Sequence, residues 1–241
     1  MVNKELRSAY PEFDFIGEET YYIGQPLTDA PTFIVDPIDG TTNFVHNFPQ
    51  VCISLGFTVG KIPTVGVIYN PFLGELWTAI KGKGSFRTRN GTQREKLPLR
   101  APEPFKDLST CLVAAEWGSD RSGNNYKVKL DAMAKLAGDK KDGGSMVHSI
   151  RSMGSAAMNI VAVAAGQLDA YWEGGCWAWD VAAGWVILTE AGGVMYSGNP
   201  GEDVAVDCRK FLAIRGSPVG QEAIRDEFYH CIGNGRMDYS S

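Results

Sequence analysis

Two aspartates after a short apolar run carry the strongest chemical signal in this chain. Asp36 and Asp39 stand in the run DPIDGTT, directly after TFIV. Pro37 keeps Asp36 out of the helical region and Gly40 permits a tight bend, so both carboxylates can point into one small volume. Carboxylate and carbonyl oxygens are the ligands that Mg²⁺ prefers. The spacing therefore predicts a site for hard divalent cations, with the Ile38 carbonyl as a further ligand.

The run DPIDG also occurs in ordinary turns, in which the aspartates accept hydrogen bonds from nearby backbone amides. Other acidic residues at the ends of predicted elements favour the cation site. Glu18 and Glu19 follow a predicted strand at 14–17, and Asp180 begins an apolar helix. Taken singly, the glutamates suit a solvated turn and Asp180 suits a helix N-cap. Taken with the aspartate pair, they predict an acidic cluster that holds cations.

The residues that follow the aspartate pair are suited to bind an anion. The run GTTN at 40–43 can open a short helix through Val45, whose free amides would point at the anion. The Thr41 hydroxyl can hold a water beside the metals, and a plain N-cap role for Thr41 is compatible with this. The segment Gly154–Ala156 is most simply the cap of an alanine-rich helix, in which Ser155 binds no ligand.

Short strands and helices must position these groups. In the first half, strands are predicted at 14–17 and 32–36, with an antiparallel meander over 51–86 and a polar surface segment at 87–108. In the second half, strands are predicted at 110–115, 146–150, 168–172 and 210–214, and helices at 125–137, 155–165, 180–191 and 219–232. We expect one domain over 1–241, with a metal-site and meander half at about 1–108 and an α/β half at about 109–241.

Composition excludes several classes of protein. The chain has 241 residues, of which 44% are hydrophobic and 21% charged, as in an ordinary globular protein. A net charge of −5 argues against a nucleic acid partner. No apolar run reaches the roughly 18 residues of a membrane span, so no membrane partner is expected. The five scattered cysteines indicate neither a disulfide framework nor a zinc site, and we expect a cytoplasmic protein.

The order of the motifs resembles the inositol monophosphatase family of Mg²⁺-dependent, lithium-sensitive phosphatases. The matching segments are FIGEE at 15–19, FIVDPIDGTTNFVHNF at 33–48, GKG at 82–84, IRSMGSA at 150–156, WDVAAG at 179–184 and TEAGG at 189–193. Together they span nearly the whole chain. The resemblance implies an α+β fold, the layered αβαβα sandwich of the inositol monophosphatase and fructose-bisphosphatase type, and a homodimer.

The resemblance also implies a role for each matching residue. Two or three Mg²⁺ ions would be held by Glu18, Asp36, Asp39 and Asp180 and by the Ile38 carbonyl. Glu18 and Thr41 would orient and activate the attacking water. The residues implied to contact the phosphorylated polyol are Glu18, Ile38, Asp39, Gly40, Thr41, Gly154, Ser155, Ala156, Glu173 and Asp180. Within this set, Gly40 and Thr41 would hold the phosphate, while Glu173 and the segment 154–156 would contact the ring.

Two departures from the family pattern affect these expectations. Family members carry two further N-terminal helices, with an acidic motif and a lysine near the metals, and residues 3–10 match only the end of that region. Without those helices we expect exposed apolar surface on the sheet that they cover and weaker support for Glu18. The run GGCWA at 174–178 also differs from common versions of the pocket, and the bulky Trp177 leaves the exact substrate open.

The leading hypothesis is Mg²⁺-dependent hydrolysis of myo-inositol monophosphate. A phosphate ester approaches carboxylates unfavourably unless divalent ions intervene, and such ions can activate water and stabilise the leaving alkoxide. Another phosphorylated polyol, a fructose bisphosphate or a phosphoadenosine nucleotide is an alternative substrate. Glu173 favours a neutral, hydroxyl-rich ring, because a carboxylate accepts hydroxyl hydrogen bonds and repels a second phosphate. A third hypothesis is a truncated, non-catalytic member of the family.

Overall fold

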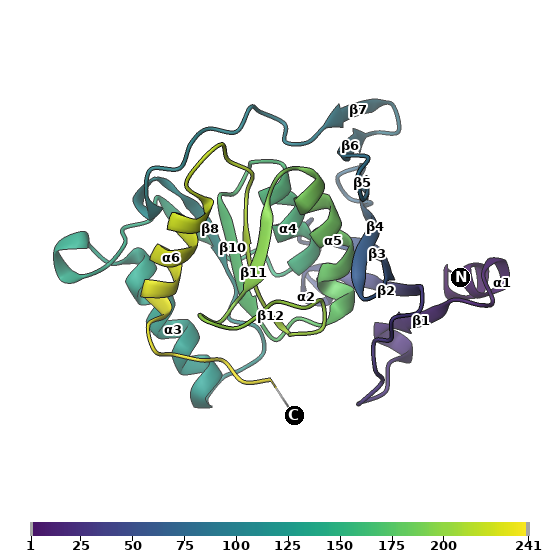
Figure 1. Ribbon diagram of the computed structural model, residues 1–241, viewed down its shortest axis with the longest axis horizontal. Helices are drawn as coiled ribbons and strands as arrows, with labels where there is room; N and C mark the ends of the chain where they lie inside the picture. Colours follow the sequence, from purple (N-terminus) through teal and green to yellow (C-terminus); the bar gives the residue numbers. More distant parts are fainter. Residues whose placement is uncertain (1, 240–241) are drawn as a thin grey trace.

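The computed structural model describes residues 2–239 and contains two β-sheets with helices between and beside them (Figure 1). The strands of the first sheet are neighbours in chain order: β1 (Asp14–Gly17), β2 (Thr32–Asp39), β3 (Cys52–Val59), β4 (Ile62–Asn70), β5 (Glu75–Ile80), β6 (Ser85–Arg89) and β7 (Gln93–Lys96). β1 and β2 are parallel, and the later pairs form the predicted antiparallel meander. β7 is a polar edge strand that the sequence does not predict, because QREK has no apolar alternation.

The inner face of this seven-stranded sheet packs against helix α5 (Ala178–Glu190). A Cβ at Gly56 would lie 2.8 Å from the Ala182 Cβ, and one at Gly66 would lie 2.2 Å from the Ala183 carbonyl oxygen. Glycine at these two positions therefore lets the helix approach the sheet closely. This close packing brings the start of α5, with Asp180, to the seven-stranded sheet that also carries Asp36 and Asp39.

The second sheet has five strands in the order β11-β12-β10-β8-β9. Their bounds are β8 (Leu112–Ala115), β9 (Ser149–Arg151), β10 (Ala170–Gly174), β11 (Val194–Ser197) and β12 (Lys210–Ile214). β8, β9 and β10 are parallel, and β12 runs antiparallel between β10 and β11. β11 is the strand of this sheet that the sequence does not predict. It follows directly on the Gly192-Gly193 end of α5 and has only four residues.

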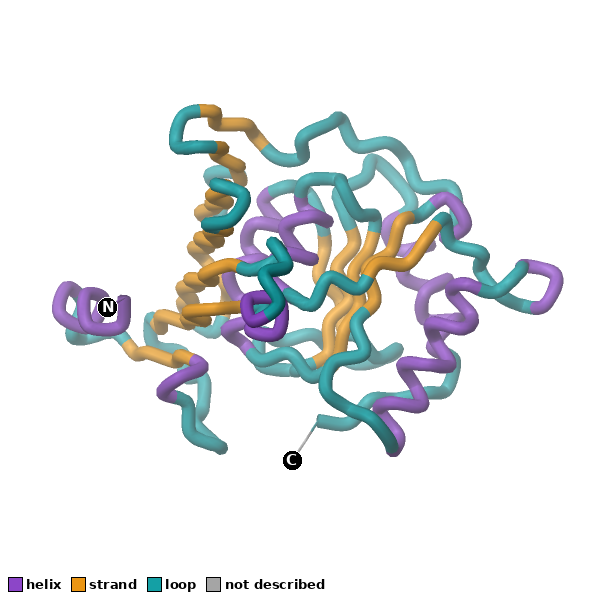
Figure 2. The backbone as a smooth tube through the Cα atoms, turned by 180° about the vertical axis from the view of Figure 1, so that it is seen from behind, coloured by secondary structure: helices purple, strands orange, loops and turns teal. Residues whose placement is uncertain are grey.

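Helices α4 (Ala156–Ala164) and α5 lie between the two sheets, and α3 (Gly123–Ala137) and α6 (Gln221–Ile232) cover the other face of the five-stranded sheet (Figures 1 and 2). The remaining elements are α1 (Val2–Ala9), α2 (Thr41–Val45) and the 3-10 turns η1 (Glu18–Thr20), η2 (Leu108–Thr110) and η3 (Lys140–Asp142). The sheet, helix, sheet and helix layers agree with the expected α+β layered sandwich. Within residues 2–239, only α1 lies beside the outer face of the seven-stranded sheet, and it buries none of its residues.

Apolar side chains on that outer face are only partly covered. Leu55, Phe57, Val65 and Val67 are half-buried. Phe57 joins Phe33 in an aromatic cluster, with ring centroids 4.9 Å apart. These side chains therefore keep part of their apolar surface accessible.

None of the helices between Val2 and Tyr239 combines the length and apolar character of a membrane span. All five cysteines are free, and four of them are buried.

Candidate functional site

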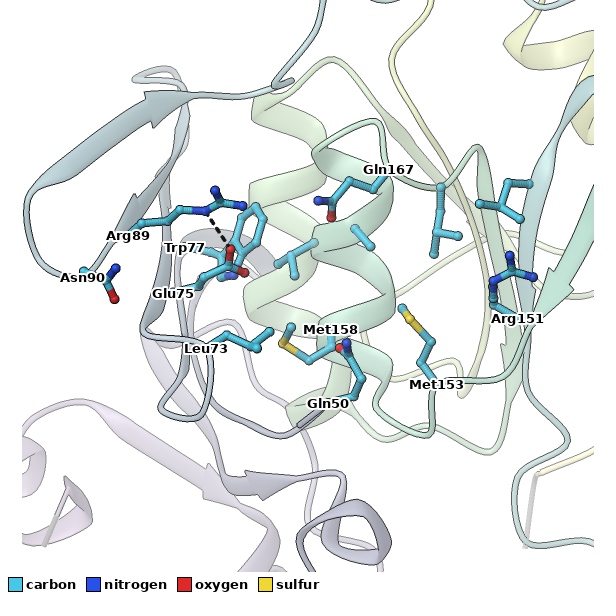
Figure 3. A pocket seen from close by; sticks show the side chains of 14 residues that line it. Gln50, Leu73, Glu75, Trp77, Arg89, Asn90, Arg151, Met153, Met158 and Gln167 are labelled. Atoms are coloured by element: carbon cyan, nitrogen blue, oxygen red, sulfur yellow. Dashed lines mark hydrogen bonds and ion pairs between the residues drawn. The ribbon is translucent and has the colours of Figure 1, made fainter. Parts of the chain in front are cut away.

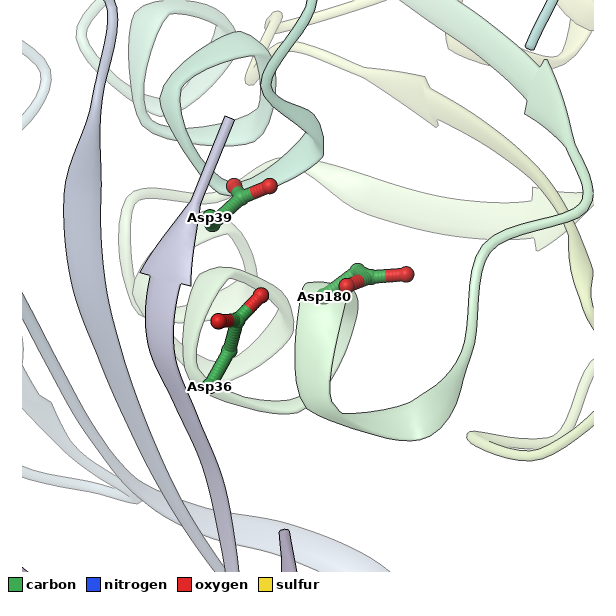
Figure 4. Close-up of side chains that lie close together, drawn as sticks. All are labelled: Asp36, Asp39 and Asp180. Carbon is green, nitrogen blue, oxygen red and sulfur yellow. The ribbon is translucent and has the colours of Figure 1, made fainter. Parts of the chain in front are cut away.

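Three aspartates converge where β2 ends and α5 begins (Figure 4). Asp36 and Asp39 come from the end of β2, and Asp180 comes from the first turn of α5. One carboxylate oxygen of each lies within 4.8 Å of the other two. Asp36 is 2% exposed and Asp39 is 7% exposed. Three of the four predicted carboxylate ligands are therefore brought together in a largely buried cluster.

An irregularity in β2 lets both of its aspartates reach this place. Residues three apart in a regular strand face opposite sides of a sheet, but the register against β3 shifts between Asp36 and Asp39. The Ile38 amide donates to Asp36 Oδ1 at 2.8 Å, which closes a local turn. Gly40 follows with a φ of 88°, and a Cβ there would lie 2.8 Å from the Gln50 carbonyl oxygen. The bend predicted from DPIDG is confirmed, and α2 begins directly after it.

Asp39 is held at the N-terminus of α4. Its Oδ2 accepts hydrogen bonds from Ser155 Oγ at 2.6 Å and from the Ala157 amide at 2.8 Å. Ser155 also caps α4, because its Oγ accepts from the Met158 amide at 3.2 Å. The predicted cap is therefore confirmed. The same hydroxyl has a second partner that the sequence does not reveal, a carboxylate more than one hundred residues away.

Asp180 is attached to the first turn of its own helix. Its Oδ2 accepts from the Trp177 amide at 2.7 Å. The N-cap alternative is thereby corrected: the N-cap residue is Trp177, and Asp180 is the third residue of α5. Asp39 and Asp180 thus both lie at helix N-termini, where the helix dipole stabilises negative charge.

Burial raises the pKa of each of the three aspartates. It raises the pKa of Asp36 to about 8, helped by the negative charges of Asp39 and Glu18. It raises the pKa of Asp39 to about 6, although the hydrogen bond from Ser155 acts in the opposite direction. Burial and the charge of Asp39 hold the pKa of Asp180 well above its usual range. A divalent cation among these oxygens would supply the counter-charge, so the donor set fits a hard metal ion.

Glu18 lies at the same edge of the sheet but outside the three-aspartate cluster. Because β1 and β2 are parallel with Gly17 opposite Val35, Glu18 and Asp36 leave neighbouring strand ends. The charge of Glu18 acts on the pKa values of both Asp36 and Asp39. Its side chain is exposed at the start of η1. The fourth predicted ligand is thus near the cluster without belonging to the set within 4.8 Å.

A polar cavity of about 580 Å³ opens beside the aspartates. The predicted site residues that line it are Asp39, Thr41, Gly154, Ser155, Ala156, Glu173 and Asp180. Those that do not line it are Glu18, Asp36, Ile38 and Gly40. Four acidic residues line the cavity, and Arg121 is the one cationic residue among the described residues that do so. A phosphate ester therefore needs added positive charge to bind here.

Glu173 lines the cavity from the end of β10. The Tyr171 hydroxyl donates to its Oε2 at 2.5 Å. Burial and the negative charge of Glu116 raise the pKa of Glu173 to about 7. Its carboxylate has the chemistry to accept hydrogen bonds from the hydroxyl groups of a ligand.

Glu116 is a structural residue of the site that the sequence did not single out. It is 5% exposed and follows β8. Its Oε1 accepts from the amides of Met153 and Gly154 at 2.5 and 2.8 Å, and its Oε2 accepts from Ser152 Oγ. Glu116 therefore holds the loop that leads into α4. The available signal was an acidic residue directly after a predicted strand, as at Glu18.

Trp177 points away from the cavity. Its ring stacks on that of Trp179 with centroids 5.2 Å apart, and the Arg209 guanidinium carbon lies 3.6 Å from its centroid. Trp177 lines a separate, smaller pocket, whereas Gly174, Gly175 and Cys176 line the polar cavity. The expectation that Trp177 affects the choice of substrate is therefore not supported, because its side chain does not narrow the cavity.

A second cavity, of about 620 Å³, lies between α4 and strands β5 and β6 of the seven-stranded sheet (Figure 3). Its side chains are mixed in character, with Leu73 and Met158 beside an ion pair between Arg89 Nε and Glu75 Oε1 at 3.0 Å. It contains no group of converging carboxylates among the described residues. We therefore place the chemistry in the smaller, acidic cavity.

Comparison with known proteins assigns the family. The model of the inositol monophosphatase family matches residues 1–228. Inositol monophosphatase 2 of Saccharomyces cerevisiae is 46% identical, over 99% of this chain and 80% of that protein. The solved inositol monophosphatase of Anabaena covers 98% of this chain and 84% of its own, with a TM-score of 0.75 and 28% identity. The solved structure of staphylococcal SaIMPase-II with inositol monophosphate bound covers 95% of this chain and 79% of its own, with a TM-score of 0.72 and 26% identity. The chain therefore belongs to the inositol monophosphatase family.

Proposed function

We propose that this chain hydrolyses myo-inositol monophosphate to myo-inositol and phosphate with the help of Mg²⁺. The observation that carries the proposal is the cluster of Asp36, Asp39 and Asp180 beside a polar cavity whose lining is mainly acidic. Such a site repels a phosphate ester until divalent cations are bound. Membership in the family supports the same reaction, since the relatives compared above are named for it.

The proposed metal ligands are Glu18, Asp36, Asp39, Asp180 and the Ile38 carbonyl, for two or three Mg²⁺ ions. When bound, the ions supply positive charge that lowers the pKa of a water and stabilises the leaving alkoxide. Burial of Asp36 and Asp39 limits competition from bulk water for these oxygens. The hydrogen bonds from Ser155 and Ala157 hold one oxygen of Asp39 in a fixed orientation.

The remaining steps use groups of the chain itself. Thr41 orients the attacking water and Glu18 accepts its proton. The backbone of Gly40 and Thr41 holds the phosphate. The water oxygen then forms a bond to phosphorus while the bond from phosphorus to the inositol oxygen breaks. The leaving oxygen takes up a proton from solvent, and solvent also receives the proton that Glu18 accepted. Glu173 and the segment Gly154–Ala156 contact the ring.

Phosphate release from inositol 1-phosphate tests this proposal. We expect Mg²⁺-dependent turnover that EDTA abolishes, and a loss of about 10³-fold or more in kcat for Asp39→Asn. Glu18→Gln should lose activity, whereas Glu19→Gln, the matched control on the neighbouring residue, should not. Undiminished turnover in Asp39→Asn would contradict the metal-site assignment. A panel with a fructose bisphosphate and a phosphoadenosine nucleotide tests the substrate class.

We also propose a homodimer and a cytoplasmic location. The resemblance to the family supports the dimer, and sedimentation equilibrium of the purified chain measures it directly. The free state of all five cysteines supports a reducing compartment. Fluorescence microscopy of the tagged chain in its own cells tests the location.

A further inference from the structure

A buried lysine that the proposed mechanism does not use connects two segments that line the polar cavity. Lys129 lies in α3 and is 0% exposed. Its Nζ donates to the carbonyl oxygens of Trp117 and Gly174, each at 2.9 Å, and to Asp120 Oδ2 at 3.2 Å. An ammonium group has three hydrogens to donate, so these contacts satisfy all of them.

The two carbonyl groups belong to two separate segments of the cavity lining, which lie at or just after the ends of the neighbouring strands β8 and β10. One segment contributes Trp117, Gly118 and Ser119, and the other contributes Glu173, Gly174 and Gly175. Lys129 therefore ties together two segments that are about fifty residues apart in the chain. The space around it is tight, because a Cβ on Gly118 would lie 3.0 Å from Lys129 Nζ and 4.0 Å from Glu173 Oε1.

The segment 237–239 completes this connection. The Tyr239 hydroxyl lies 2.8 Å from Asp120 Oδ2 and 2.9 Å from the Gly174 carbonyl oxygen. Met237 is 2% exposed, and a Cβ at Gly174 would lie 2.5 Å from its Sδ. The backbone of Met237 is fixed in turn by two hydrogen bonds with Asn199. Met237 and Tyr239 thus pack against Gly174 at the end of β10 and restrict its movement.

A buried ammonium is costly, and apolar residues of similar volume often stabilise a fold as well as a buried ion pair does. Packing alone therefore does not explain a lysine at position 129. What its three directed hydrogen bonds provide is a fixed spacing between the Trp117–Asp120 segment and the end of β10. Glu173 is the residue next to Gly174, so its carboxylate moves with the carbonyl group that Lys129 holds.

We propose that Lys129 is a positioning residue that sets the place of Glu173 in the cavity and so the preference for a hydroxyl-rich ring. The inference rests on the proposed function, because it assigns Glu173 to the ring. Lys129 does not touch the substrate in this arrangement. Burial raises the pKa of Glu173, and the positive charge of Lys129 acts in the opposite direction. The lysine thereby favours the ionised carboxylate, which accepts hydrogen bonds.

The test compares two substrates in wild type and Lys129→Met. Inositol 1-phosphate offers ring hydroxyls to Glu173, and p-nitrophenyl phosphate offers none. We expect the ratio of the two kcat/KM values to fall about 10-fold in Lys129→Met, through a higher KM for inositol 1-phosphate. The value for p-nitrophenyl phosphate should change less than about 2-fold. Equal losses on both substrates, or an unchanged ratio, would overturn the proposal.

Further measurements separate the proposal from effects on folding and from the proposed function. In a Glu173→Gln background, Lys129→Met should lower the ratio no further, because residues that act through one another are not additive. If Lys129→Met does not fold, Tyr239→Phe removes one hydroxyl and should shift the ratio in the same direction. Turnover of inositol 1-phosphate by wild type tests the function itself. A crystal structure of either variant tests the positioning without turnover, since an unmoved Glu173 would contradict it.

Discussion

Ser155 Oγ donates a 2.6 Å hydrogen bond to Asp39 Oδ2 and accepts one from the Met158 amide. One hydroxyl therefore joins the first turn of α4 to a carboxylate of the three-aspartate cluster. Because the helix and the seven-stranded sheet belong to different layers, this contact fixes the cluster relative to the loop that lines the cavity. Together with the Ala157 amide, which donates to the same oxygen at 2.8 Å, Ser155 couples the position of the proposed metal ligand Asp39 to the segment proposed to contact the ring.

Removal of this hydroxyl should weaken metal binding more than folding. We expect Ser155→Ala to lower the apparent Mg²⁺ affinity about 10- to 100-fold, because residues that orient a metal ligand contribute on that scale. The lost cap should cost about 1 kcal/mol of unfolding free energy. Mg²⁺ titration of phosphate release measures the first effect, and urea unfolding measures the second. An unaltered Mg²⁺ dependence in a folded variant would show that the contact serves only to cap α4.

The pKa values of the cluster predict how Mg²⁺ stabilisation depends on pH. The folded, metal-free chain holds Asp36 and Asp39 at pKa values of about 8 and about 6, above their ordinary value of 3.8. A raised carboxylate pKa means that the folded state binds protons more tightly than the unfolded state. The contribution of these groups to stability is therefore fully present below the ordinary pKa and is lost as the pH rises through 6 to 8.

Bound Mg²⁺ should remove this loss, because it replaces the protons as counter-charge. The increase in melting temperature on adding Mg²⁺ should therefore be larger at about pH 8.5 than at about pH 5. Calorimetry with and without Mg²⁺ measures it. Asp36→Asn is the control, in which both the increase and its pH dependence should shrink. An increase of the same size at both pH values would contradict the assignment of the cation to this cluster.

Glu116 gives a prediction for the loop at 152–154. In Glu116→Gln, an NH₂ group replaces one of the two acceptor oxygens. The side chain can then no longer accept hydrogen bonds from Ser152, Met153 and Gly154 together. We expect a loss of about 1–3 kcal/mol in unfolding free energy, measured by urea denaturation. Glu103→Gln on the surface is the matched control and should change stability by less than about 0.5 kcal/mol. A neutral Glu116→Gln would mean that the loop does not depend on this carboxylate.

Sequence-based inference was most successful where the signal is local. The bend at DPIDG, the Ser155 cap and the short helix at Thr41–Val45 all follow from residues within a few positions of one another. Asp180 taken alone indicates only a helix start; it joined the predicted acidic cluster because other acidic residues also end predicted elements, and the resemblance gave it the role of a metal ligand. The close approach of α5 to the sheet that brings it there depends on glycines in β3 and β4, which no local pattern connects to it.

The residues that support the site were harder to predict. Glu116 acts on a loop more than thirty residues away, and Lys129 stands in a helix where a lysine ordinarily faces solvent. β7 lacks apolar alternation because it is an edge strand. Trp177 was expected to matter because of its size, whereas its surroundings, Trp179 and Arg209, decide where the ring lies. For Glu116 and Lys129, contacts distant in sequence determine the outcome.

The most direct test is a crystal structure of the protein grown with Mn²⁺, which replaces Mg²⁺ at oxygen sites and scatters anomalously. We expect anomalous peaks between the carboxylates of Asp36, Asp39 and Asp180, one oxygen of each of which lies within 4.8 Å of the other two. The same crystals of Asp39→Asn should show weaker peaks or none. Anomalous peaks confined to other positions, or none at Mn²⁺ concentrations that support turnover, would contradict the claim that these three aspartates hold the cations that receive the phosphate.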